Sequence, residues 1–355
     1  MNRFTRSEKW IFWGVNGFLA LLAAACLLLG RSVCTALPTL NAAETWAGES
    51  GRPFVQLACY LPNDKPLSEE DVWKFRQTVV AKLTEAALET PENGSLYTDA
   101  YAGFGTLKVT GERGSAEVKV AGVGGDFFRF HPLRLRSGSY LTENDLMRDR
   151  VILDEELAWK LFGGMDLTGL SVTIGTADYY VAGVVSREDD RYSTLAYTDG
   201  AGMFMSYSAL KQCQETAGIS CYETVLPEPI TSFGKNLLNE SFPLNGGVLV
   251  DNSSRYSLGN LLTVIGDFGQ RSMGRSGIIY PYWENAVRST EDYAALLLVL
   301  TGLFAALPAV SVTVTVVLRG RKLWKTAVST AKTKAADRIE RRREEKWRAA
   351  NEKRE

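Results

Sequence analysis

The histidine at position 131 is the first residue to consider for chemistry, because the sequence contains only one histidine. A site built on several histidines, such as a zinc centre, is therefore excluded by the count alone. No nucleophile, base or metal-ligand cluster gathers around His131 in the stretch 117–187. Histidine rarely acts in catalysis without a partner that orients it. We predict that His131 is a surface or packing residue.

A glycine cluster, Gly122-x-Gly124-Gly125, is the second candidate, because glycine-rich loops can cradle phosphates. Such a loop must lead directly into the start of a helix, which this one is not expected to do. We interpret it as a turn. The sequence also contains no Walker A motif. If ATP drives this protein, another subunit must bind it.

Acidic residues in the run Glu188-Asp189-Asp190, with Asp199 nearby, could in principle hold calcium. Their spacing is not that of an EF-hand loop, and an acidic loop after a strand is more often solvated. We therefore predict a solvated loop. No catalytic, cofactor-binding or metal-binding residue is assigned, no cofactor is expected, and the protein is predicted not to be an enzyme.

Five cysteines occur, at positions 26, 34, 59, 213 and 221. Cys26 lies within an apolar run, and the other four lie beyond it. Cys213 and Cys221 are close enough in sequence for a disulfide that closes a loop in an oxidising compartment. Sequence alone does not fix the distance between their Cα atoms. The disulfide and two free thiols both remain open.

Charge and apolar length divide the chain into five zones. Residues 10–30 and 293–318 are uncharged, and each run is long enough to cross ~30 Å of hydrocarbon as a helix. Residues 1–9 carry three basic residues against one acidic residue, and residues 319–355 carry fourteen against six. The middle region, 31–292, is acidic in balance. We predict two transmembrane helices that flank one large domain.

The positive-inside rule places both basic ends in the cytoplasm and residues 31–292 outside the cell membrane. A cleaved signal peptide is the alternative for residues 10–30, but their apolar core exceeds the usual ~7–15 residues. A net charge of −1 gives no sign of nucleic-acid binding. The basic tail suits an anionic lipid surface.

The best-defined elements lie between Glu117 and Arg187. Alternation predicts a strand from Glu117 that the paired glycines end, and it is followed by Phe127 and Phe128, which we predict to be core residues. A strand over 150–153 leads into a helix over 154–162, with Asp154 as its N-cap and Gly163-Gly164 as its stop. Two further strands are predicted at 171–175 and 179–185.

Elements outside this stretch follow from the same signals. The spacing of apolar residues predicts a helix from Ser68, which forms a capping box with Asp71, to about residue 89. Strands are predicted at 53–60, 107–110, 203–205 and 247–250, helices at 206–210, 230–240 and 257–268, and a loop-rich segment at 213–229. From Glu284 the chain is expected to continue as a helix into the second apolar run.

One set of motifs resembles the extracytoplasmic core domain of MacB-like and FtsX-like ABC transporter permeases of bacteria. The matching features are Val120-Ala-Gly-Val123, Asp126-Phe127-Phe128, Leu135…Ser137-Gly138, Val151-Ile-Leu-Asp154, Ala158-Trp-Lys160-Leu161-Phe162-Gly163, Gly169 and Tyr180-Val-Ala-Gly183-Val184-Val185. Their order and spacing are kept over about seventy residues. Ser139 departs from the pattern, because the family often has Arg there. The resemblance implies an α+β extracytoplasmic domain with two subdomains, a mixed sheet and a β-rich insertion.

The resemblance also implies a function. In this family, such domains belong to membrane machines that couple cytoplasmic ATPase strokes to an extracytoplasmic domain. For this chain we expect ATP hydrolysis on a separate ABC ATPase subunit, with other permease subunits as possible partners. The family's chain continues after the second span into a coupling helix and two further membrane helices, whereas residues 319–355 contain no further apolar run. We therefore expect either a transmitting or partner-binding membrane protein, or a stand-alone envelope scaffold. The tail would be a lipid-associated segment or a docking helix for the ATPase.

Overall fold

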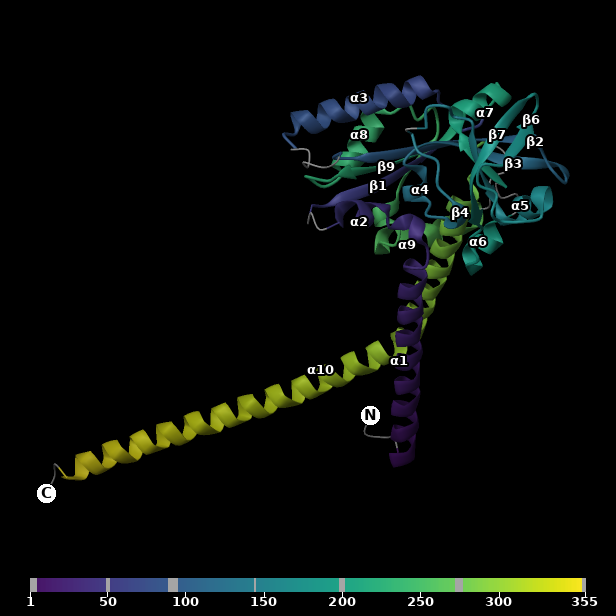
Figure 1. Ribbon diagram of the computed structural model, residues 1–355. Coiled ribbons are helices and arrows are strands. Elements are labelled where there is room, and N and C mark those ends of the chain that lie inside the picture. The colour runs from purple at the N-terminus through teal and green to yellow at the C-terminus, as the bar shows by residue number, and fades with distance from the viewer. Residues whose placement is uncertain are drawn as a thin grey trace. The chain divides into compact units, whose positions relative to one another are not determined.

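The computed structural model describes residues 5–48, 52–88, 95–143, 145–197, 202–271 and 277–352. The chain divides into two compact units (Figure 1). One unit comprises Arg31–Leu296, and the other comprises Met1–Gly30 with Leu297–Glu355.

The first unit is built on a ten-stranded sheet with the order β10-β1-β9-β2-β3-β8-β5-β7-β4, and β6 pairs with both β2 and β7. The pairs β3–β8 and β5–β7 are parallel, and the other pairs are antiparallel. The expected mixed α+β fold is confirmed, and one continuous sheet runs through the whole unit. The strands are β1 Phe54–Tyr60, β2 Thr98–Gly111, β3 Gly114–Gly125, β4 Arg134–Gly138, β5 Arg150–Asp154, β6 Ser171–Ile174, β7 Ala177–Ser186, β8 Met203–Ser206, β9 Ile219–Pro227 and β10 Val248–Asp251.

Helices cover both faces of this sheet. The helices and short 3₁₀ turns are α2 Ala42–Ala47, α3 Glu69–Glu85, α4 Phe127–Phe130, α5 Glu155–Phe162, α6 Arg191–Ala196, α7 Tyr207–Cys213, α8 Phe233–Ser241 and α9 Leu258–Asp267, with η1 Pro38–Leu40, η3 Asn252–Ser254 and η4 Phe268–Gln270. Helix α3 has the predicted capping box between Ser68 and Asp71, and it ends at Glu85, a few residues earlier than expected.

The hairpin β2–β3 is longer than the sequence indicates, because β2 already begins at Thr98. The predicted break after β3 is confirmed at Gly125, which has a φ of +66°. A Cβ atom there would lie 2.3 Å from the carbonyl oxygen of Asp99. Only glycine accepts this backbone conformation and this close approach without strain.

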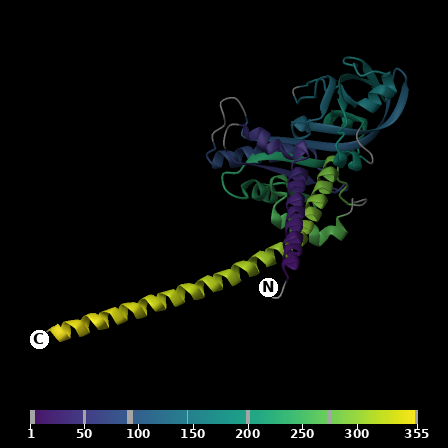
Figure 2. The same cartoon turned by 90° about the horizontal axis from the view of Figure 1, so that it is seen from below.

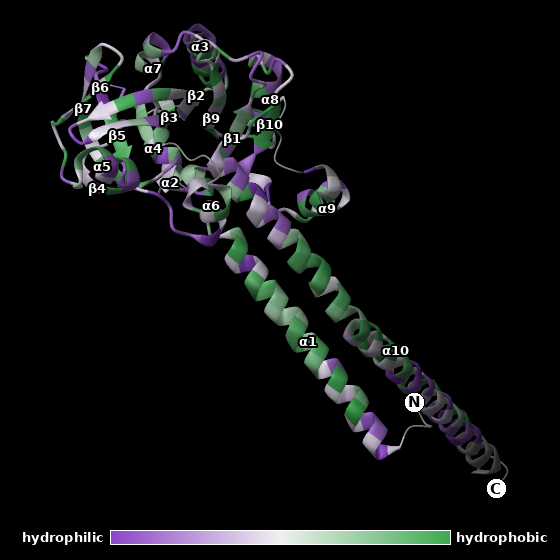
Figure 3. Cartoon of the chain, turned by 90° about the vertical axis from the view of Figure 1, so that its right-hand side faces the viewer, coloured by the Kyte–Doolittle hydropathy of each residue, from purple (hydrophilic) through white to green (hydrophobic). Residues whose placement is uncertain are grey.

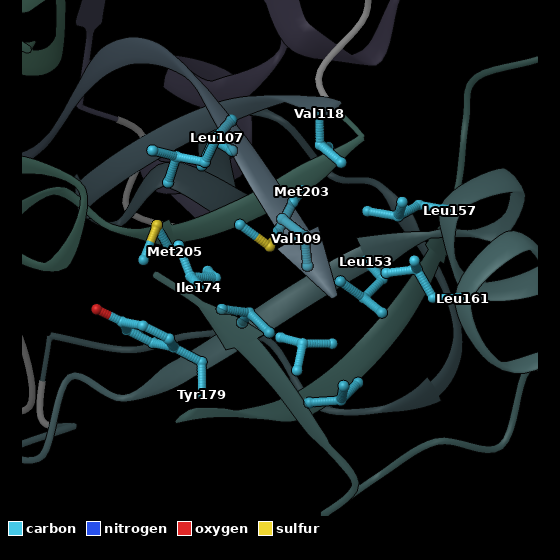
Figure 4. Close-up of a cluster of buried hydrophobic side chains, with 14 of the residues drawn as sticks. Leu107, Val109, Val118, Leu153, Leu157, Leu161, Ile174, Tyr179, Met203 and Met205 are labelled. Atoms are coloured by element: carbon cyan, nitrogen blue, oxygen red, sulfur yellow. The ribbon is translucent and has the colours of Figure 1, made fainter. Parts of the chain in front are cut away.

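The strand–helix unit β5–α5 also agrees with its prediction. The Asp154 carboxylate accepts a hydrogen bond from the backbone N–H of Leu157 at 2.7 Å and caps the helix. Gly163 closes the helix in the left-handed conformation, with φ +76°. The helix packs Leu157 and Leu161 into a core cluster with the Met203 and Met205 side chains of β8 (Figure 4).

The prediction of a loop-rich segment at 213–229 is wrong. Most of this segment forms β9, an interior strand of the sheet. This strand pairs with β1 on one side and β2 on the other. Prolines and charged residues in CYETVLPEP suggested a loop. In the sheet, Cys221 and Val225 enter one core cluster and Tyr222 and Leu226 enter the cluster on the opposite face. Burial on both faces hides the alternation that marks a half-exposed strand.

The second unit contains most of helix α1, Arg6–Cys34, and most of helix α10, Tyr282–Glu352. Each has a segment that is long and apolar enough to cross a membrane. Figure 3 shows these segments as predominantly hydrophobic and the last part of α10 as hydrophilic. Helix α10 is continuous from Tyr282 through Pro308, as expected from the sequence (Figure 2).

Candidate functional site

Trp283, in the first turn of α10, anchors this helix in the core of the sheet domain. Its side chain is 4% exposed. The indole centroid lies 4.4 Å from the ring of His131, 5.5 Å from Phe127 and 5.6 Å from Phe104. Aromatic pairs of this kind contribute about 0.5–1.5 kcal/mol each beyond the burial of area. The start of α10 is therefore fixed to α4 and β2 at once.

A buried ion network lies beside this anchor. The Arg255 guanidinium, which follows η3, is 3% exposed and pairs with Glu284 and Glu291 of α10. Its Nη1 lies 3.1 Å from Glu291 Oε1, and its Nε donates to Asn252 Oδ1 at 2.7 Å. The Tyr60 hydroxyl, at the end of β1, donates to Glu284 Oε2 at 3.0 Å. The network thus joins β1, η3 and α10.

Burial sets the protonation of this network. It raises the pKa of the Glu284 carboxyl above its usual value, although Arg255 acts in the opposite direction. Burial and the Glu284 charge together raise the pKa of Tyr60 well above its ordinary value. Tyr60 therefore remains a hydrogen-bond donor at neutral pH. Removing the Arg255 cation would leave a carboxylate in a dry environment, which is the costly case for buried charge.

The network continues to the loop that follows η4. Arg271 Nη2 lies 2.5 Å from Glu291 Oε2, and its Nε lies 3.2 Å from Asp292 Oδ1. The hydroxyl groups of Tyr256 and Thr290 lie 2.6 Å apart. The residues directly before and after α9 thus both contact the same stretch of α10. We call Tyr60, Arg255, Arg271 and the residues Trp283, Glu284 and Glu291 the α10 junction.

Of the two predicted positions for His131, packing in the core is correct and the surface is wrong. The residue is 1% exposed, and its Nε2 lies 2.5 Å from Glu223 Oε2 on β9. His131 Nδ1 and Trp283 Nε1 are buried and have no hydrogen-bond partner among the described residues. A buried polar atom without a partner costs about 1–3 kcal/mol. The anchor of α10 therefore contains two unsatisfied polar atoms in neighbouring rings.

Phe127 and Phe128, the two phenylalanines after the glycine pair, differ in how deeply their side chains are buried. Phe127 is 2% exposed and lies in the core, as predicted. Phe128 is only half-buried, so its prediction as a full core residue is wrong. Its ring stacks on Tyr140 at 4.8 Å. The short helix α4 turns only one of two adjacent side chains fully inward.

The acidic run after β7 has structural contacts, which corrects the interpretation as a simple solvated loop. Glu188 accepts hydrogen bonds from the hydroxyls of Tyr282 and Tyr197. Burial raises the pKa of the Glu188 carboxyl. Asp190 caps α6 by accepting from the backbone N–H of Tyr192. Asp199 lies outside the described residues.

Cysteines 26, 34, 59, 213 and 221 are all free thiols in the structure, so Cys213 and Cys221 form no disulfide. Cys213 Sγ lies 3.2 Å from the Tyr179 hydroxyl, whereas Cys221 is buried in the cluster that also contains Trp283. The two thiols therefore pack in different parts of the core. The expectation that no helix follows the glycine cluster is wrong, because α4 begins at Phe127, two residues after Gly125. This helix has only one turn, and the glycines end β3 as a turn, which agrees with the turn interpretation.

A cleft of about 330 Å³ opens elsewhere on the domain. It lies between the start of α3, the end of β3, residues 141–143 and 145–150, and the start of α7. Glu69, Tyr101, Arg148, Arg150 and Tyr207 are among its lining residues. Within the described ranges, no three side chains of His, Cys, Asp or Glu are grouped so that they could hold a metal ion.

Most of the α10 junction was missed by the sequence analysis. Arg255 follows η3, whereas Glu284 and Glu291 lie on α10, and nothing in the sequence indicates that this arginine meets the two glutamates. The signal that could have been used is Trp283-Glu284, which stands only ten residues before an uncharged run. A charged residue at the start of a long helix is usually exposed, so this signal is weak.

Comparisons with known proteins agree with the motifs. Residues 50–226 match the profile of the MacB-like periplasmic core domain. The macrolide export ATP-binding/permease protein MacB of Chromobacterium violaceum is 33% identical over 91 residues, which are 25% of this chain and 14% of that protein. The match therefore spans a small part of the relative's length.

Two solved structures are also similar. The periplasmic region of MacB from Actinobacillus actinomycetemcomitans has 16% identity and a TM-score of 0.38, and it covers 62% of this chain and 94% of that one. The extracellular domain of the noncanonic ABC-type transporter YknZ from Gram-positive bacteria has 16% identity and a TM-score of 0.37, with 56% and 98% covered. The profile match carries the assignment: by residues 50–226, this chain belongs with the proteins that contain a MacB-like periplasmic core domain.

Proposed function

We propose that this chain is a non-enzymatic membrane protein in which α10 transmits conformational change between the membrane and the sheet domain. ATP hydrolysis would occur on a separate ABC ATPase subunit. The α10 junction is the single observation that carries the proposal. It ties the start of one helix to β1, α4 and η3 through ion pairs and a buried indole.

Packed protein interiors have low compressibility and transmit strain. A buried ion network and an interlocked aromatic cluster do not deform gradually, because small displacements break contacts that are strong only at short range. Such elements change between discrete arrangements. His131 Nδ1 and Trp283 Nε1, which have no partner in the part of the chain that the structure describes, support this view, since a second arrangement could satisfy them. A displacement of α10 would then reach the centre of the sheet through Glu223 on β9.

The first test concerns the partner. We expect that the full-length protein, purified from its native host in a gentle detergent, recovers an ATPase with a Walker A motif. A variant with residues 321–355 scrambled at constant composition separates the two roles of the tail. Loss of the ATPase with unchanged binding to anionic vesicles would identify a docking helix. Retention of both would identify a tail that only lies on lipid, where each basic residue contributes about 1 kcal/mol.

The second test examines transmission itself. The protein is labelled with 5-fluorotryptophan, and the resonance that disappears in Trp283→Phe is assigned to the junction. Binding of a non-hydrolysable ATP analogue to the recovered complex is expected to shift this resonance. In Arg255→Met, the shift should be lost while the ATPase remains bound. A resonance that stays unchanged in a complex that hydrolyses ATP would refute transmission through α10.

Topology is the third prediction, and it follows from the distribution of charge. Protease added to intact spheroplasts should digest the region 31–292, whereas an epitope placed after Glu355 should remain protected. Lysed spheroplasts provide the control, because the epitope should then be digested. Digestion of the epitope in intact spheroplasts would overturn the placement of the C-terminal end in the cytoplasm.

A stand-alone envelope scaffold is the second candidate. The cleft between α3 and α7 favours it, because an open cleft lined by Glu69, Tyr101, Arg148 and Arg150 offers both charge and aromatic surface to a partner segment. Failure to recover any ATPase in the first test, with the domain folded, would favour this function over transmission.

A further inference from the structure

Helix α9 presents an apolar side that the domain does not cover. Leu258 and Leu262 are 62% and 56% exposed, and Phe268, the first residue of the turn η4 that follows, is 65% exposed. At roughly 100° per residue, Leu258, Leu262 and Ile265 fall on one side of the helix. Leu261 and Val264 are buried and face the domain. Asn260, Thr263 and Asp267 make up the side opposite to the exposed leucines, so α9 is divided into a buried, an apolar and a polar side.

The position of α9 along α10 is fixed by two sets of contacts. Before α9, the hydroxyls of Tyr256 and Thr290 lie 2.6 Å apart. After α9, Arg271 pairs with Glu291 and Asp292. Asp292 is the last charged residue before the uncharged run that begins at Tyr293. Figure 1 shows α9 at the same end of the sheet domain as the start of α10. The exposed apolar side therefore lies where α10 becomes uncharged.

We infer that α9 lies in the membrane interface and inserts its exposed apolar side between lipid headgroups and acyl chains. A helix with a distinct apolar side and low charge binds an interface chiefly through buried apolar area. Within 257–271 the only charged residues are Asp267 and Arg271, and Arg271 is engaged by α10. The expected ligand is thus a neutral bilayer surface, and anionic lipid should not be required. This inference rests on the proposal that residues 293–318 cross the membrane.

In this position α9 would limit how closely the sheet domain approaches the bilayer. Arg271, which follows α9, pairs with Glu291 of the buried network, and Tyr256, which precedes α9, contacts the neighbouring Thr290. A force on α9 would therefore be transmitted to Glu291 through Arg271. A domain that rested on the bilayer through α9 would be held at a fixed height above the membrane. An isolated apolar patch of this kind in an aqueous position would instead favour association with other surfaces.

Photocrosslinking in the full-length protein tests the inference. p-Benzoylphenylalanine is introduced at Leu262 or Phe268, and the protein is placed in nanodiscs of tagged phosphatidylcholine. Thr263 is the matched control, because it is exposed on the same helix about 100° from Leu262. Leu303, which is 66% exposed within the uncharged run, is the positive control. Lipid adducts at 262 and 268 are expected to exceed those at 263 several-fold and to be unchanged when anionic lipid is added.

Three outcomes would overturn the inference in distinguishable ways. Adducts at 303, but no excess at 262 and 268 over 263, would show that α9 stays in water although α10 spans the bilayer. Protein–protein adducts between two copies at 268 would identify the apolar side as a subunit interface. Absence of lipid adducts at 303 would refute the membrane span, and the position of α9 with it.

Discussion

Replacing Arg255 with methionine is expected to lower the free energy of unfolding by about 3–5 kcal/mol, because it removes one partner of a buried ion network. Methionine retains much of the side-chain length, so the effect would come from charge rather than from a large cavity. The Glu284 carboxylate is 3% exposed, and the Tyr60 hydroxyl would be its one remaining side-chain donor among the described residues. Glu291 would keep Arg271 at 2.5 Å.

Urea denaturation of the full-length protein in detergent, followed by near-ultraviolet circular dichroism, provides the measurement. Lys74→Met is the control, since Lys74 forms an exposed pair with Glu70 on α3, and exposed pairs contribute little to stability. The double variant Arg255→Met/Glu284→Gln should recover part of the loss, because no charge then remains unpaired at position 284. An Arg255→Met protein with the stability of the Lys74→Met control would contradict the network.

Phe127→Ala is expected to lower the free energy of unfolding by about 3–5 kcal/mol, the usual range for a buried phenylalanine. Its ring touches the junction directly, with centroid distances of 5.5 Å to Trp283 and 4.6 Å to His131. Phe128→Ala should have less than half of this effect. Its ring is half-buried, and its stacking partner Tyr140 is itself partly exposed.

These two adjacent positions form a matched pair, because the substitution and the local backbone are the same. The two variants are compared by urea denaturation under the conditions used for Arg255→Met. Phe127→Ala should also broaden or shift the fluorine resonance of Trp283, whereas Phe128→Ala should not. Equal losses of stability in both variants would mean that burial does not distinguish the two rings, against the structure.

Local signals in the sequence were sufficient for much of the fold. The helix α5 was predicted with its N-cap Asp154 and its stop at Gly163, because caps and left-handed glycines depend on residues within one turn. The capping box of α3 and the break after β3 were correct for the same reason. The resemblance over about seventy residues identified the family that the profile match then supported.

Errors arose where burial depends on distant parts of the chain. The strand β9 was predicted as a loop, because its residues pack on both faces and show no alternation of apolar and polar positions. The half-exposure of Phe128 depends on Tyr140, and the burial of His131 depends on Glu223 and Trp283. None of these partners is a neighbour in sequence.

The mixed α+β class, the local caps and turns, and the two apolar runs that flank an acidic region could all be predicted from the amino-acid sequence. These properties follow from residue type and from spacing within a few turns. The contact of Arg255 and Tyr60 with Glu284 could not be predicted in this way, because these residues are separated from Glu284 by 29 and 224 positions along the chain. In a sequence, a charged residue that will be buried looks the same as one that will be solvated. Folding alone places them together, since each can be buried only when the others neutralise it.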